Sequence, residues 1–235
     1  MDTDGSAGTG VLGRFWAAAI GAEFRNDPEA DPAGEVVAPV PGGDIAMCMV
    51  PEARTVKHRV HIDVNTGSVE ELVALGASVL LPAAESGFGW TQMTDPEGGE
   101  FCAFVREALA SPVAPASPAS PVEPVETPYR LYELGVDCAD PQRIAHWWGE
   151  RFGVEAGYDE EHGWAWLEDI PGVPFESIVF AQVPEPKAVK NRIHWDVYGD
   201  VAELEAAGAT RLWETPKWVT LADPEGNEFC CFAPS

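Results

Sequence analysis

The sequence predicts an α+β fold made of two tandem copies of one unit. The stretch 50–64 recurs at 183–197, with Val-Pro-Glu, Val-Lys, Arg, His and Asp-Val at identical spacing. A second motif, Asp-Pro-Glu-Gly-x-Glu-Phe-Cys, ends each copy at 95–102 and 223–230. Because self-similarity at a fixed spacing marks a repeated structural unit, we expect both copies to have the same fold.

Each copy is expected to contain the order strand, helix and three strands twice. Glycines follow the predicted helices, as is common at helix C-termini. The expected helices cover 11–20, 69–75, 141–152 and 201–207. The expected strands cover 35–40, 45–50, 59–64, 78–81, 90–94, 100–105, 130–137, 154–158, 164–168, 177–183, 192–197, 210–213, 218–223 and 228–233. The first strand of the first copy would have to lie within residues 1–8, which have little strand propensity, so we expect it to be missing or irregular.

The expected domains are residues 1–105 and 129–235. The segment between them, 106–128, is rich in Pro, Ala and Ser, a composition typical of an extended linker. At about 3 Å per residue, such a linker could cross a whole domain. Neighbouring modules could therefore come from one copy or be exchanged between the two copies.

Composition restricts the class of partner. The net charge of −25 argues against nucleic acid and against an anionic membrane surface, because both require clustered Lys and Arg. No apolar run approaches the ~20 residues that span a membrane, and the first residues do not resemble a secretory signal. The five cysteines form no disulfide pattern, which favours a reducing compartment. We expect a cytoplasmic protein, either a monomer whose copies form a pseudo-dimer or a homodimer.

Three sets of residues carry a family resemblance: the helix start Phe15-Trp-Ala-Ala-Ala-Ile-Gly, the two Val-Pro-Glu…Val-Lys-x-Arg-x-His-x-Asp-Val stretches and the two Asp-Pro-Glu-Gly-x-Glu-Phe-Cys ends. In these the sequence resembles the vicinal oxygen chelate superfamily, which contains glyoxalases, bleomycin-resistance proteins and extradiol dioxygenases. It is most similar to the glyoxalase-like tandem-domain branch common in actinobacteria. The resemblance implies paired βαβββ modules whose curved sheet forms a cup around a small ligand.

The resemblance also implies a divalent-metal site with ligands from the first strand, the fourth strand, the strand after it and the last strand of a copy. In the second copy these places fall on Glu133, His194 and Cys230, with the fourth near Phe180 or Gln182. Cys230 stands where the family usually has a glutamate, which counts against a metal.

Strand parity offers further ligands, because side chains two residues apart point to the same face. Glu228 therefore shares a face with Cys230, and Asp196 shares one with His194. A set of Glu133, His194 and Glu228, with Asp196 or Cys230 as further contacts, would suit Zn, Mn, Ni or Fe. In the alternative interpretation, His194 and Asp196 hydrogen-bond to each other and Glu228 lies in water.

The first copy lacks one of these ligands. Aligning its helix with the helix of the second copy puts Met1 at the place of Glu133. The remaining counterparts are His61, Asp63, Glu100 and Cys102. We therefore expect the first copy to be structural and the second to contain the functional cup.

Tryptophans are concentrated in the second copy, which contains seven of the nine. Trp164 and Trp166 share a face of one strand, and together with Trp218 and Gln182 they would line a cup for a flat apolar ligand. The alternative is that these rings fill the core, as we expect for Trp147 or Trp148.

Two classes of function follow. In the first, the protein binds a small aromatic or apolar molecule without an obligatory metal, for sequestration and resistance or for metal-free catalysis. Glu133, His194, Asp196 and Glu228 would then be the polar contacts, one of them acting as general base. In the second, a metal held by Glu133, His194 and Glu228 or Cys230 makes the protein a lyase, isomerase or dioxygenase. A catalytically inert structural module is the third alternative.

Overall fold

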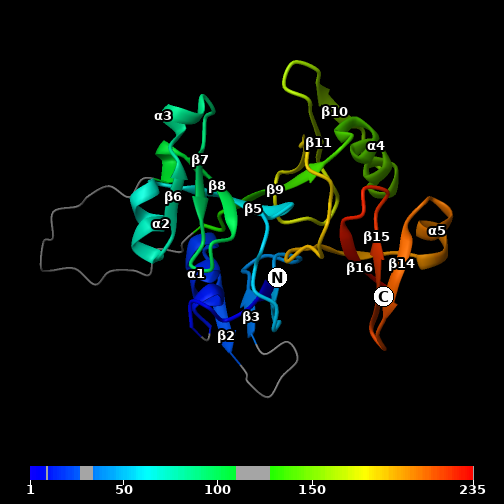
Figure 1. Ribbon diagram of the computed structural model, residues 1–235, viewed down its shortest axis with the longest axis horizontal. Coiled ribbons are helices and arrows are strands. Elements are labelled where there is room, and N and C mark those ends of the chain that lie inside the picture. Colours follow the sequence, from blue (N-terminus) through cyan, green and yellow to red (C-terminus); the bar gives the residue numbers. More distant parts are fainter. Residues whose placement is uncertain (9, 27–33, 110–127, 235) are drawn as a thin grey trace, which may run out of the picture.

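The structure is a computed structural model that describes residues 1–8, 10–26, 34–109 and 128–234 (Figure 1). Most of the expected linker 106–128 lies outside the described residues. The first copy contains β1 (Asp2–Thr3), α1 (Val11–Ile20), β2 (Glu23–Asn26), β3 (Gly34–Val37), β4 (Ile45–Met49), β5 (Val60–Thr66), α2 (Val69–Leu75), β6 (Ser78–Leu81), α3 (Ala83–Ser86), β7 (Thr91–Thr94), β8 (Glu100–Val105) and a 3₁₀ turn (Glu107–Leu109). The second copy contains β9 (Leu131–Cys138), α4 (Pro141–Phe152), β10 (Ala156–Asp159), β11 (Trp164–Glu168), β12 (Ser177–Gln182), β13 (Asp196–Tyr198), α5 (Val201–Ala206), β14 (Thr210–Glu214), β15 (Trp218–Ala222) and β16 (Glu228–Phe232). The predicted α+β fold with four βαβββ modules is confirmed.

The first module departs from the expectation in two strands. A first strand is present, but β1 has only two residues and pairs in parallel with β4. The strand β2, which pairs with β3, falls where the sequence predicts none. Its residues, Glu-Phe-Arg-Asn, show no strong strand propensity, so pairing with β3 decides their conformation.

The largest sheet joins the two copies. Its strand order is β10-β11-β12-β9-β5-β8-β7-β6, so it combines the second module of the first copy with the first module of the second copy. β5 and β9 are antiparallel, with Asp63 opposite Glu133 and His61 opposite Gly135. Figure 1 shows β5 and β9 at the join between the two halves. Of the two arrangements that the linker allows, the structure therefore has the exchanged one.

Two four-stranded sheets make up the rest, with the orders β1-β4-β3-β2 and β13-β16-β15-β14. They contain the first module of the first copy and the second module of the second copy. The N–H of Asp2 donates to the carbonyl of Arg192 at 2.6 Å and links the two sheets at one point. Among the described residues, this half therefore has no counterpart of the long β5–β9 pairing.

Buried tryptophans hold the two modules of each copy together on the side of the helices. Trp16 of α1 packs against Phe101 of β8 with ring centroids 5.3 Å apart, and Trp148 of α4 packs against Phe229 of β16 at 4.9 Å. Trp147 and Trp148 are both buried, which confirms the expectation that this pair fills core. Among the described residues, no helix is long and apolar enough to cross a membrane.

Candidate functional site

Three polar side chains meet on one face of the eight-stranded sheet. His61 and Asp63 alternate along β5, and Cys102 lies on the neighbouring strand β8. The carboxylate oxygen Oδ1 of Asp63 lies 2.8 Å from Nδ1 of His61 and accepts a 2.6 Å hydrogen bond from the backbone N–H of Cys102. Potential ligand atoms of the three side chains all lie within 4.8 Å of one another.

Glu133 brings a second carboxyl group to this cluster from the other copy. It lies on β9 directly opposite Asp63, and the hydroxyl of Ser177 donates to its Oε2 at 3.0 Å. Burial and then the charge of Asp63 raise the pKa of Glu133 to about 7. A carboxyl group with such a pKa exchanges its proton near neutral pH.

The Asp63 carboxylate also controls the charge of its neighbours. Burial alone would lower the pKa of His61, but the charge of Asp63 and its hydrogen bond outweigh burial and raise this pKa above its ordinary value. Burial and then Asp63 raise the pKa of the Cys102 thiol. The cluster therefore combines a His–Asp pair, a neutral thiol and a carboxyl group that titrates near pH 7.

Gly135 is required for this arrangement. A Cβ atom at position 135 would lie 2.2 Å from Cε1 of His61, a distance at which something must shift. The imidazole thus occupies the space that a side chain on β9 would take, which brings the first copy's histidine against the second copy's strand.

A row of aromatic rings lies along the same face. The face can be traced by register, since directly opposed residues share it: Gly135 is opposite Val179, and Val179 is opposite Trp166. Trp164 lies two residues before Trp166 on β11 and therefore points the same way. The ring of Trp166 covers Gly157, where a Cβ atom would lie 2.3 Å from Cε2 of Trp166.

The aromatic rings of the two halves meet above this face. Trp90 precedes β7, and its ring centroid lies 5.8 Å from that of Trp164 although four strands separate β7 from β11 in the sheet. Phe88 stacks on Trp90 at 4.7 Å and lies 5.7 Å from Trp164. The sheet must therefore be strongly curved, with the His61 face on the inside of the curve.

The aromatic row ends at Tyr132, next to the positively charged side chain of Arg106. Phe104 of β8 lies 5.3 Å from Trp90 and 4.7 Å from Tyr132. The guanidinium of the exposed Arg106 lies 4.8 Å from the centroid of Tyr132, and its Nε donates to Asn65 at 2.7 Å. A cation next to an aromatic surface can contact an anionic substituent of a bound ring.

The repeated counterpart of this cluster contains His194, Asp196 and Cys230. Nε2 of His194 lies 3.3 Å from Sγ of Cys230. Burial, with positive groups nearby, lowers the pKa of His194 to about 4, the opposite direction to the shift of the His61 pKa. Burial first, and further the charge and hydrogen bond of Asp196, raise the pKa of Cys230 to about 11.

The structure separates the predicted metal ligands Glu133, His194 and Glu228. Glu133 lies beside His61 and Asp63, as the exchanged arrangement requires. Glu228 forms a 2.7 Å ion pair with Lys187 and accepts the N–H of Asn191 at 3.1 Å. The equivalent Glu100 pairs with Arg54 at 2.9 Å. Both glutamates tie the repeated 50–64 and 183–197 stretches to the last strand of their copy.

The other predicted ligand-binding residues have different surroundings. Gln182 is exposed and donates from Nε2 to the carbonyl of Ala139 at 3.1 Å. Trp218 lies on β15, outside the eight-stranded sheet, 5.6 Å from Phe232. Only Trp164 and Trp166 of the predicted aromatic set share the face of Glu133.

Several residues of the site were not predicted, namely Ser177, Gly135, Tyr132, Phe88, Trp90, Phe104 and Arg106. Strand parity could have placed two of them on the face of Cys102. Phe104 lies two residues after Cys102, and Trp90 lies two residues before Gln92, which is paired with Cys102. Gly135, Tyr132 and Ser177 depend on the pairing of β9 with β5 and with β12, which the sequence left open.

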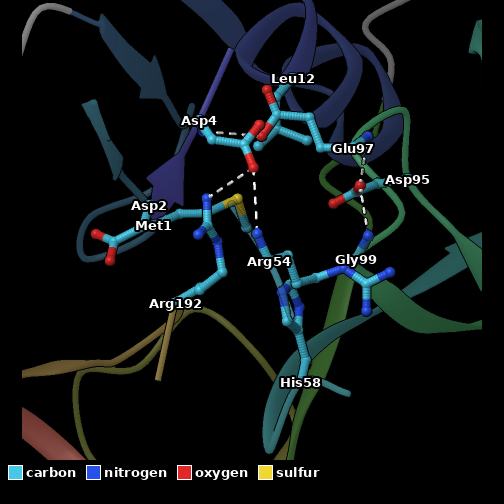
Figure 2. Close-up of a pocket in the computed structure, with 10 residues that line it drawn as sticks. All are labelled: Met1, Asp2, Asp4, Leu12, Arg54, His58, Asp95, Glu97, Gly99 and Arg192. Carbon is cyan, nitrogen blue, oxygen red and sulfur yellow. Dashed lines mark hydrogen bonds and ion pairs between the residues drawn. The ribbon is translucent and has the colours of Figure 1, made fainter. Parts of the chain in front are cut away.

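The N-terminal residues link the two repeated stretches. Asp4 accepts the N–H of Arg54 at 3.3 Å and lies 3.6 Å from the guanidinium of Arg192 (Figure 2). The cavity beside these residues is only ≈ 10 Å³, about the size of one water molecule. It is too small for an organic ligand, so we assign these contacts to assembly of the fold.

The ion pairs of two lysines show that the expected alignment of the copies has to be changed. Lys57 pairs with Asp137 at 2.8 Å, and its repeat counterpart Lys190 pairs with Asp2. Asp2 therefore stands at the place of Asp137, and the alignment of Met1 with Glu133 was wrong. Its cause is a longer loop: Asp2 precedes Trp16 by 14 residues, whereas Asp137 precedes Trp148 by 11.

Comparison with known proteins agrees with this architecture. A family model described as a glyoxalase-like domain matches residues 2–104 and 133–232. A mutant of glyoxalase I from Zea mays aligns with a TM-score of 0.57 at 14% identity, covering 94% of this chain and 88% of that chain. A protein from Bacillus subtilis proposed to be a dioxygenase aligns with a TM-score of 0.59 at 14% identity, covering 96% and 81%. At these identities the likeness shows the fold alone. None of the curated proteins compared matches the sequence.

Proposed function

Because this chain belongs to the glyoxalase-like domain family of the vicinal oxygen chelate superfamily, we propose that it binds a small aromatic molecule inside the curved eight-stranded sheet and exchanges a proton with it through Glu133. The observation that carries the proposal is the position of Glu133. Its pKa is raised to about 7, and it faces the His61–Asp63 pair on the surface that the aromatic row follows.

The aromatic row supports a flat ligand. Ring stacking is favourable when centroids are about 4.5–7 Å apart, and the row already holds its own rings at such distances, for example Phe88 on Trp90 at 4.7 Å. Phe88 is also 39% exposed, which is unusual for a large apolar side chain that serves only the core. A planar ligand would take up this exposed aromatic surface, and Arg106 would contact an anionic substituent on it.

The carboxyl group of Glu133 supports proton transfer. A general base works best when its pKa lies near the working pH. Near pH 7 Glu133 is divided between its neutral and ionised forms, so it can accept a proton from an acidic C–H or O–H of the ligand and return it. The Ser177 hydroxyl orients the carboxylate by donating to Oε2.

A second candidate function is metal-dependent catalysis, which the donor set at the same site favours. An imidazole, a carboxylate and a thiol within 4.8 Å suit a divalent ion such as zinc. His61, Asp63 and Cys102 would hold the ion, and it would polarise a ligand oxygen as a Lewis acid. The Asp63 oxygen would then have to exchange part of its present hydrogen bonding to His61 and Cys102 for the ion.

Trp164→Ala should weaken ligand binding roughly five- to a hundredfold, because stacking of a planar ring on an aromatic side chain contributes about 1–3 kcal/mol. We would measure binding of a panel of small aromatic alcohols, ketones and carboxylates by tryptophan fluorescence and calorimetry. Trp218→Ala is the matched control, since Trp218 lies outside the eight-stranded sheet, and should leave the affinity unchanged. Equal losses in both variants, or no binder for the parent protein, would contradict the proposal.

Elemental analysis distinguishes the two candidate functions. If the site requires a metal, the purified protein should contain close to one equivalent, and His61→Ala or Cys102→Ala should remove it. His194→Ala and Cys230→Ala are the repeat-matched controls and should retain it. A protein that takes up no zinc, manganese, nickel or ferrous iron but binds its aromatic ligand would exclude the metal-dependent candidate.

A further inference from the structure

The two halves of the molecule differ at one strand edge. β5 is paired on both sides, with β8 and with β9. In the part of the chain that the structure describes, its repeat counterpart β13 is paired only with β16. The repeat places His61, Asp63 and Asn65 at the positions of His194, Asp196 and Tyr198. β9 pairs with the outer side of β5, but no described residue pairs with the outer side of β13.

Two equivalent backbone hydrogen bonds, one in each half, show in which register a strand would pair with the outer side of β13. In one half the N–H of Asp137 donates to Arg59 at 2.7 Å, and in the other the N–H of Asp2 donates to Arg192 at 2.6 Å. Since Asp2 takes the place of Asp137, Met1 takes the place of Val136, and no described residue stands beside β13 at the places of Leu131–Gly135. These are the residues that lie along β5 in the complete half.

The backbone of β13 offers unused hydrogen-bonding groups on that side. Cys230 N–H donates to the carbonyl of Trp195, and Gly199 N–H donates to the carbonyl of Phe232, so alternate residues face β16. Asp196 and Tyr198 therefore direct their backbone groups to the outer edge. Over the described ranges no backbone hydrogen bond reaches this edge, and Tyr198 is 76% exposed.

A cleft of ≈ 320 Å³ lies beside this edge, between α4 and α5. Its apolar lining includes Trp148, Phe152, Leu204 and Ala207. In the complete half, the same place next to α1 and α2 is filled by Arg130.

The contacts of Arg130 show how that place is filled. Its N–H donates to the carbonyl of Ile20 at 2.9 Å, its carbonyl accepts the N–H of Asn65 at 2.9 Å, and its guanidinium pairs with Glu71 at 3.0 Å. Ile20 corresponds to Phe152 and Glu71 to Leu204 in the repeat. The cleft is therefore the space that the N-terminal end of a β9-like strand would occupy.

We propose that the outer edge of β13 and the α4–α5 cleft form an acceptor site for an extended peptide segment of a partner protein, which adds antiparallel to β13. The site lies in the half opposite Glu133 and does not depend on the proposed function. Strand addition to an open edge is an established mode of peptide recognition, and an open edge with unpaired backbone groups is otherwise a liability.

The chemistry of the site defines the peptide. By analogy with β9, an aliphatic side chain would pack beneath the sheet, as Leu134 does, and a small residue would lie opposite His194, as Gly135 lies opposite His61. The rim of the cleft contains Glu150, Asp200 and Glu203 against the single cation Arg151. This charge favours a basic residue at the end of the peptide that enters the cleft.

The test uses the chain's own strand as a probe. A synthetic peptide with the sequence of residues 129–135, Tyr-Arg-Leu-Tyr-Glu-Leu-Gly, stops before the places that Met1 and Asp2 occupy. It is titrated into the full-length protein and followed by calorimetry. Two N-methylated peptides serve as a matched pair. Asp137 N–H faces β5, so the amide two residues earlier, at Gly135, faces the same way. Methylation there should block pairing, whereas methylation at Leu134, whose amide faces the other way, should not.

The proposal expects saturable binding of the parent and Leu134-methylated peptides and at least a tenfold weaker binding of the Gly135-methylated peptide. Tyr198→Pro, which removes one outer-edge N–H at an exposed position, should weaken the parent peptide tenfold without lowering the melting temperature. Absence of binding at millimolar peptide, or equal binding of the two methylated peptides, would overturn it. A dimer seen in sedimentation that the peptide does not dissociate would also overturn it, since a second copy would then cover the edge.

Discussion

Glu133→Gln should make the protein more stable at pH 8 and remove a pH dependence that the parent protein has. The folded pKa of Glu133 is about 7, above its ordinary value of 4.5. Between these two values the folded state keeps a proton that the unfolded state has lost, so stability falls as pH rises from about 4.5 to about 7. A shift of this size corresponds to about 3 kcal/mol at pH 8, which the neutral glutamine would recover.

Urea unfolding at pH 4.5, 6 and 8 measures this effect. Glu228→Gln is the matched control, because Glu228 is the repeat counterpart of Glu100 and is paired with Lys187. It should lower the free energy of unfolding at pH 8. If Glu133→Gln were also destabilising at pH 8, Glu133 would be an ordinary paired carboxylate and the proposed acid–base role would fail. Under the proposed function the same variant should slow turnover by about 10²–10⁴-fold.

Separating the two copies should abolish independent folding. In the exchanged arrangement, cutting between the copies exposes the paired edges of β5 and β9 and the buried side chains along them, such as Ile62 and Leu134. We expect fragments 1–105 and 129–235 to show no cooperative thermal transition alone, because each would lose half of its largest sheet. Mixing them in equal amounts should restore a 1:1 complex with a cooperative melt.

Circular dichroism and sedimentation of the fragments, alone and mixed, make this comparison. The intact chain cut only within the linker by a protease is the control, since it retains every strand pairing. Two fragments that are each stable and monomeric and do not bind each other would contradict the exchanged sheet and the composition of the site.

The repeat made most of the fold predictable. Two copies, four modules and most strands follow from the spacing of the 50–64 and 183–197 stretches, because the duplicated motifs align the sequence of one copy with that of the other. The strand β2 could not be predicted, since its residues have no strong preference and pairing with β3 determines them. The first strand was expected to be missing or irregular, and β1 has only two residues.

The composition of the site was less predictable for a topological reason. His61, Asp63, Cys102 and Glu133 were all identified as candidates from the sequence, but grouping them required knowing which strand β9 pairs with. Strand parity assigns a residue to a face and says nothing about the neighbouring strand. The loop after β1 caused a second error: its three additional residues shifted the alignment that put Met1 at the place of Glu133.

The central claim is that Glu133 of the second copy belongs to a site with Asp63 of the first. The most direct test is a pH titration of the ¹³C-labelled glutamate carboxyl groups by NMR, with Glu133→Gln assigning the resonance. We predict an apparent pKa near 7 for Glu133, which Asp63→Asn lowers by removing a neighbouring negative charge and the repeat-matched Asp196→Asn leaves unchanged. A response to Asp196→Asn but not to Asp63→Asn would contradict the account, because Glu133 would then face the second copy's own cluster.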